Sequence, residues 1–139
     1  MCIRDRAHIS AGELISFRSS LALKMACDVI RDRGLDTPDH LGDAFNDAVG
    51  SGLSNPESVF SKLSASVGAE THLGHVLGAD LAAFRSYWLG QDIVILGEGD
   101  AAHWIEASLK SQFAMVRREP QDYLGRGARA VRAHVMGET

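Results

Sequence analysis

Cysteine and long apolar runs are both scarce in this sequence. Among 139 residues there are two cysteines, Cys2 and Cys27. Two are too few for a disulfide framework, so a reducing cytoplasm is the expected location. No apolar run approaches the roughly 20 residues that cross a bilayer, and no signal-peptide pattern opens the sequence. We therefore expect no membrane partner.

The sequence also lacks an excess of positive charge. Lysine and arginine number 14 against 18 acids, which gives a formal net charge of -4. The densest basic groups, Arg31 with Arg33 and Arg126 with Arg129 and Arg132, fall at expected helix ends or on solvated faces. Because no basic stripe is present to replace the counterions of phosphates, a nucleic-acid partner is excluded.

What the chain does contain is a hydrophobic content of 45%, enough for the core of one soluble domain. Apolar residues recur at helical spacing through the first two thirds, and glycine or proline separates the repeats. This pattern predicts helices from Ser10 or Ala11 to about Gly34, from Thr37-Pro38 to around Gly50–Gly52, from Asn55-Pro56 to about Val67, and one that carries Leu73 to Trp88 and ends at Gly90.

The last third reads as alternating strands and helices. The pattern predicts a buried strand at Ile93–Leu96, a helix that carries Ala101, Ile105 and Leu109, a second strand at Phe113–Val116, and a final helix from Pro120. The fold class is therefore α/β, helix-rich with a small partial sheet.

The turn between the first of these strands and its helix is the strongest candidate for a binding site. It consists of Gly97, Glu98, Gly99 and Asp100. Glycines allow a close approach of the backbone, and the first N–H groups of a helix are free donors, so such a turn can contact a nucleotide. An ordinary tight turn is the alternative. A Rossmann site is excluded because several further strand–helix units would have to follow.

Two histidines three residues apart, His72 and His75, raise the question of a metal site. A metal needs at least one more converging ligand, and the sequence offers none. We therefore expect solvated or capping histidines and no metal. Trp88 and Trp104 are expected to be core or groove-edge aromatics.

Five short segments, taken in their order and spacing, resemble one known family. They are Ile9–Leu14, Phe45–Pro56, Leu77–Asp80, Ile93–Gly99 and Gly127–Val131. Together they make residues 7–135 similar to the C-terminal part of 2-dehydro-3-deoxygalactonokinases, members of the actin-like ATPase and sugar kinase superfamily. The sequence departs from the family at Glu98, where serine or threonine is usual, and at Asp80, where glutamate is usual.

The resemblance implies a fold, a reaction and its cofactors. The fold would be the C-terminal lobe of an actin-like (ribonuclease H-like) sugar kinase. The reaction would be transfer of the γ-phosphate of ATP, with Mg²⁺, to 2-dehydro-3-deoxygalactonate. Gly97, Glu98, Gly99 and Asp100 would contact the nucleotide, and Glu13 is a candidate for the substrate cleft, with a plain helix-start carboxylate as its alternative.

The first six residues need a separate interpretation. Residues 1–6 resemble a translated sequencing adapter, so we interpret them as foreign and 7–139 as a fragment of the kinase lobe. The family's phosphate loop and catalytic base would lie upstream, and the fragment alone is expected to be inactive. The competing interpretation is a non-catalytic α/β module that binds a nucleotide or a partner.

Overall fold

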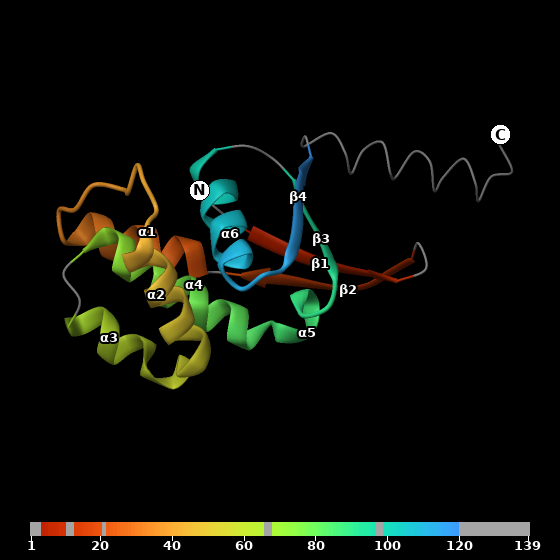
Figure 1. Cartoon of the computed structure of the whole chain (residues 1–139), viewed down its shortest axis with the longest axis horizontal. Coiled ribbons are helices and arrows are strands. Elements are labelled where there is room, and N and C mark those ends of the chain that lie inside the picture. Colours follow the sequence, from red (N-terminus) through yellow and green to blue (C-terminus); the bar gives the residue numbers. More distant parts are fainter. Residues whose placement is uncertain (1–3, 11–12, 21, 66–67, 97–98, 120–139) are drawn as a thin grey trace, which may run out of the picture.

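The structure is a computed structural model that describes residues 4–10, 13–20, 22–65, 68–96 and 99–119, with the backbone alone described over 4–20. Helices α1 to α4 gather on one side, and α6 lies beside strands β3 and β4 (Figure 1). The elements in chain order are β1 (Arg4–Ser10), β2 (Glu13–Ser20), α1 (Ala22–Asp32), α2 (Asp43–Ser54), the 3-10 turn η1 (Pro56–Ser58), α3 (Val59–Ala65), α4 (Ala69–Ala83), α5 (Arg85–Trp88), β3 (Asp92–Leu96), α6 (Asp100–Ser111) and β4 (Met115–Glu119).

The centre of the molecule is the crossing of α2 and α4, where glycines let the two backbones touch. A Cβ atom built on Gly78 would lie 2.2 Å from the carbonyl oxygen of Val49, and one on Gly52 would lie 2.4 Å from that of His75. A Cβ atom on Gly74 would lie 2.6 Å from the Cβ of Ala48 and 2.7 Å from the carbonyl oxygen of Phe45. Small residues four apart on both helices therefore set the distance between them, and Phe45, Leu73 and other apolar side chains fill the core around the contact.

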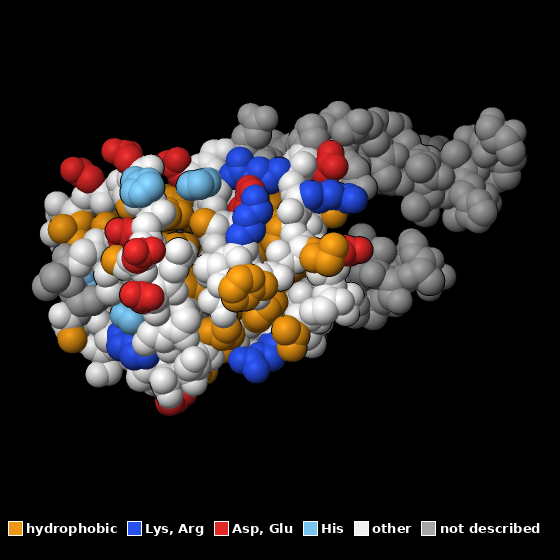
Figure 2. All heavy atoms as spheres, viewed as in Figure 1, with side chains coloured by type: hydrophobic (Ala, Val, Ile, Leu, Met, Phe, Trp, Pro, Cys, Tyr) orange, Lys and Arg blue, Asp and Glu red, His pale blue; other side chains and the backbone are white. Residues whose placement is uncertain are grey.

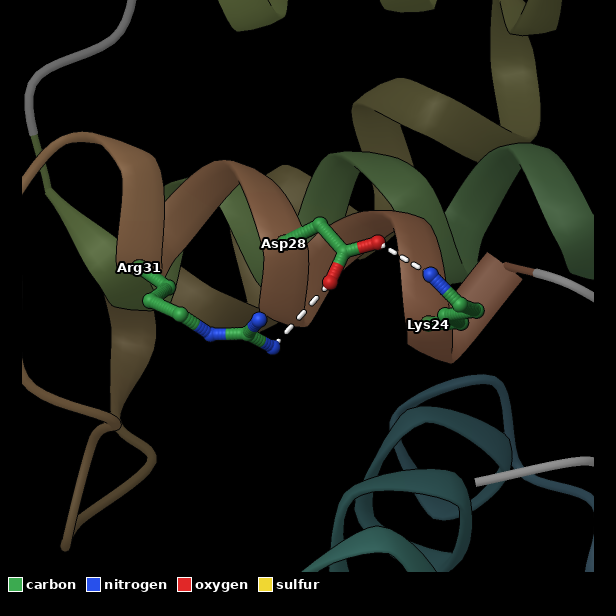
Figure 3. Close-up of polar contacts among 3 residues, drawn as sticks. All are labelled: Lys24, Asp28 and Arg31. Atoms are coloured by element: carbon green, nitrogen blue, oxygen red, sulfur yellow. Dashed lines mark hydrogen bonds and ion pairs between the residues drawn. The ribbon is translucent and has the colours of Figure 1, made fainter. Parts of the chain in front are cut away.

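Helix α1 ends as its sequence predicts, at Gly34. This glycine has a φ of 67°, and its N–H donates to the carbonyl of Arg31 while the N–H of Leu35 donates to that of Ile30. These two bonds form a Schellman motif, which satisfies carbonyls that the helix leaves without partners. On the outer side of α1, Asp28 accepts from Lys24 and from Arg31 (Figure 3).

Two of the helices expected in the first half of the chain were predicted to begin too early. Residues 13–20 form β2, which pairs antiparallel with β1, instead of the first half of a helix that runs to Gly34. Three serines and the Ile15–Phe17 pair favour a strand over a helix there, so local propensity outweighs the apolar spacing. The second helix begins at Asp43 rather than at Thr37-Pro38, because the backbone N–H of its N-cap, Gly42, is bound by the carboxylate of Glu70 on α4.

The strand–helix–strand order of the last third is confirmed. β3 and β4 pair in parallel, with Asp92 opposite Met115 and Leu96 opposite Glu119, and α6 connects them. The second strand begins at Met115 rather than at Phe113, because Phe113 belongs to the C-terminal turn of α6. The predicted helix from Pro120 lies outside the described residues. The molecule is thus mostly helical with a small parallel sheet, a general α/β arrangement.

Helix length also bears on the expected relation to membranes. Within the described part of the chain, every helix is too short or too polar to cross a bilayer.

Candidate functional site

In the turn between β3 and α6, the described residues Gly99 and Asp100 are exposed, and Gly99 has a conformation that other residues rarely adopt. Gly99 is the N-cap of α6, with a φ of 98°, and no described atom lies within 4 Å of where its Cβ would be. Its carbonyl accepts the first helical hydrogen bond, from His103 at 3.1 Å. The positive φ explains why glycine suits this position, whereas its contact with a nucleotide stays a prediction. Gly97 and Glu98 lie outside the described residues.

The electrostatics of this turn combine two opposing influences. No side chain among the described residues caps the start of α6, whose first N–H groups carry the positive end of the helix dipole. Asp100, exposed in the first turn, adds a negative charge at the same place. The turn thus offers donors from its backbone and an acceptor from Asp100, which suits hydroxyl groups better than phosphate.

Two surface hollows of the described structure lie away from Gly99 and Asp100. One hollow of about 250 Å³ lies between α1, α3 and α4 and is lined by Ala22, Met25, Val59, Val76, Ala79 and Asp80. The other, of similar volume, lies at the opposite end of β3, lined by residues 88–92 and 112–115. These two hollows therefore do not include the described residues of the turn, Gly99 and Asp100.

Glu13, the candidate for a substrate cleft, does not lie in the first turn of a helix as the alternative assumed. It is the first residue of β2, and its backbone pairs with Ser10 across the hairpin. The position of its side chain is outside what the structure describes. Its proposed role stays a prediction.

The two histidines of α4 differ in burial, and the expectation that both are solvated or capping is wrong for His72. His72 is completely buried rather than solvated, and its Nε2 lies 3.0 Å from Nη1 of Arg33. Burial first, and then the Arg33 and His75 charges, lower the pKa of His72. His72 lies one helical turn before buried Val76, so its place on the apolar face was a signal in the sequence.

The second histidine of α4, His75, is half-buried. Its pKa is also lowered, by burial and by the charge of Lys62, although the backbone of Ala48 acts in the opposite direction. The described residues contain no cluster of three or more side chains placed to hold a metal ion.

A second set of charged groups fixes α6 to the sheet. Glu106 binds Lys110 one turn later, at 2.5 Å, and reaches Nε of Arg118 on β4 at 2.6 Å. The hydrogen bond from Lys110 is the main cause that lowers the pKa of Glu106, and the Arg118 charge contributes. Because Glu106 joins the helix to the second strand, it supports the parallel unit that carries the candidate turn.

The two tryptophans are in the core, as expected. Trp88 and Trp104 are 7% and 4% exposed. Trp88 also donates from Nε1 to the carbonyl of Leu81, at 2.7 Å, which satisfies one of the last carbonyls of α4.

Comparisons with known proteins add no relative to this description. The chain matches no protein-family model, and the searches of curated proteins and of solved structures found no match.

Proposed function

We propose that this chain is one lobe of an ATP-dependent sugar-acid kinase and that the turn of residues 97–100 contacts the nucleotide. The observation that carries the proposal is the order of β3, a glycine turn and α6, with β4 parallel to β3. In such units the carboxyl end of the strand and the start of the helix form the usual ligand edge. Gly99, at a φ of 98°, places no side chain at its own position on that edge.

The charge of the turn limits which part of a nucleotide it would meet. Asp100 would repel a phosphate, whereas its carboxylate can accept from the ribose hydroxyls and the N–H groups of α6 can donate to ring or hydroxyl acceptors. The phosphates and Mg²⁺ would then be held by another lobe. The identity of the acceptor, 2-dehydro-3-deoxygalactonate, is supported by the resemblance of the sequence alone.

Binding of MgATP to the full chain tests the proposal, with two glycines as a matched pair. Gly99 and Gly90 both have positive φ values and both have open space around them, but Gly90 lies at the other end of β3. We expect weak saturable binding by calorimetry or NMR titration, weakened at least fivefold in Gly99→Val and unchanged in Gly90→Val. Equal effects of both substitutions, or no binding at millimolar MgATP, would contradict a nucleotide contact at this turn.

We further predict that the purified chain transfers no phosphate by itself. One exposed turn cannot surround ATP and a sugar acid and exclude water from both, as phosphoryl transfer requires. A coupled assay with ATP, Mg²⁺ and 2-dehydro-3-deoxygalactonate measures this directly. Turnover above the rate of a heat-denatured sample would show the prediction to be wrong.

The second candidate function, a non-catalytic module that acts through a partner, is favoured by one surface. Leu89, Phe113 and Met115 are 59%, 95% and 71% exposed around the hollow at the start of the sheet. Figure 2 shows hydrophobic side chains gathered over the region of α5, the end of α6 and the start of β4. Exposed groups of this kind often mark contacts between proteins. Loss of MgATP binding in Gly99→Val would favour the kinase, since this surface is at the opposite end of β3.

A further inference from the structure

The contact between Arg33, just after α1, and His72 of α4 determines the protonation state of His72. Arg33 carries only hydrogen-bond donors and keeps its charge at every ordinary pH. Its Nη1 lies 3.0 Å from Nε2 of His72, so this ring nitrogen must accept. His72 is therefore neutral in the folded protein, with its proton on Nδ1.

The same arginine also reaches a third helix. Nη2 of Arg33 donates to the carbonyl of Leu63 at 2.5 Å. Leu63 lies in the last turn of α3, where helix carbonyls lack partners of their own and favour a positive charge. One guanidinium thus joins the end of α1 to α3 and α4.

The helices packed against α4 carry charged groups of both signs. Lys62 of α3 binds the carbonyl and the hydroxyl of Ser51 on α2 and raises the positive potential at His75. From α2, Asp43 and Asp47 are exposed and form no ion pair with either histidine in the described structure.

The remaining acid at the start of α4, Glu70, is bound to the backbone N–H of Gly42. The negative charge of Glu70 is therefore directed to the start of α2.

We propose that Arg33 and His72 form an acid-released latch, which holds the end of α1 to α3 and α4 while His72 is neutral and opens when His72 takes up a proton. A proton on Nε2 turns the acceptor into a donor that faces another donor, and it places two cations 3.0 Å apart. His72 has no exposed surface, whereas Arg33 is exposed. Arg33 therefore turns outward into water and releases the carbonyl of Leu63.

The lowered pKa of His72 agrees with this direction. The closed form disfavours the proton, so the open form binds more protons below the ordinary histidine value of about 6.5. The latch is closed above that pH and opens as the pH falls. Opening should increase by up to about tenfold for each pH unit below 6.5, until the closed form itself becomes protonated.

Hydrogen exchange of the full chain at pH 7.5 and pH 5.5, corrected for the intrinsic exchange rate, tests the latch. We expect at least a fivefold loss of protection at the lower pH in residues 29–36 and 59–65, and little change in α6. His72→Gln keeps a neutral acceptor and should abolish this loss, whereas His103→Gln, an exposed substitution on α6, should leave it intact. Protection that is equal at both pH values in the unsubstituted chain would overturn the proposal.

A second measurement keeps the test decisive if His72→Gln does not fold. The imidazole of His72 can be titrated by NMR in the unsubstituted chain and in Arg33→Met. Removal of the guanidinium removes both a donor to the neutral ring and a repelling charge, so the pKa of His72 should rise. A pKa that is unchanged by Arg33→Met, or that is at or above 6.5 in the unsubstituted chain, would contradict the latch.

Discussion

The glycines on α2 and α4 differ in whether a larger side chain would fit at their positions. Gly78 faces the backbone of Val49, where an added Cβ would lie 2.2 Å from an oxygen. Gly50 lies in the interior of α2, and no atom lies within 4 Å of the place where its Cβ would be. Helical spacing predicted both helices but did not show which glycines lie at their crossing. That depends on how the helices meet in three dimensions.

This contrast gives a prediction for the residue scale. Gly78→Ala should lower the free energy of unfolding by about 1–3 kcal/mol, because the backbone of α2 has to shift. Gly50→Ala should raise it by roughly 0.5–1 kcal/mol, because alanine restricts the unfolded chain and favours the helix. Urea unfolding followed by circular dichroism measures both. Equal and small changes in the two variants would show that the helices do not touch through Gly78.

The C-terminal ends of helices α1 and α6 share the same hydrogen-bonding motif. Each ends in a Schellman motif, with Gly34 in the left-handed position of α1 and Phe113, at a φ of 61°, in that of α6. Leu35 and Ala114, the residues that follow, are packed against the core. The sequence showed the first end because glycine marks it. It hid the second, since phenylalanine is a residue expected in strands, and the predicted strand was therefore placed two residues early.

We predict that the protein is more stable with glycine than with phenylalanine at position 113. A left-handed conformation costs most residues roughly 1–2 kcal/mol, and the ring of Phe113 is 95% exposed, so its removal loses little burial. Phe113→Gly should stabilise the protein by about 1 kcal/mol in thermal or urea unfolding. Phe113→Ala retains the strain and should bring no such gain. If the alanine variant were equally stabilised, the benefit would come from loss of the exposed ring and not from the backbone.

At the scale of the whole molecule, acid should destabilise the fold in two separate ranges. The pKa values of His72 and His75 are lowered from 6.5, so their contribution is complete above that value and declines as the pH falls below it. The pKa of Glu106 is lowered from 4.5, so the support it gives to α6 and β4 is present above 4.5 and is lost at lower pH.

Unfolding midpoints in urea, measured at intervals from pH 8 to pH 3, should show both ranges. Glu106→Gln cannot change its charge, so it should reduce the further decline below pH 4.5 and leave the decline that begins below pH 6.5 as it is. A variant that loses both declines would mean that the two sites act on the same contact, against their separate places in the fold.

The function of the whole chain was less accessible from sequence than its elements. The pattern predicted the strand–helix–strand order of the last third, since this order depends on nearby residues. The hairpin at residues 4–20 and the Arg33–His72 contact were missed, because each depends on pairing between segments whose encounter no local pattern records. The kinase interpretation rests on short similar segments and stays a proposal that the MgATP titration will test.

The contact between α2 and α4 has a consequence for how the molecule can move. Where two helices meet through their main chains, no layer of side chains exists that could change rotamer and absorb a displacement. α2 and α4 should therefore move as one rigid body. The end of α1 and α3 are held to that body through side chains, including the arginine of the proposed latch, and internal motion should be concentrated at these joints.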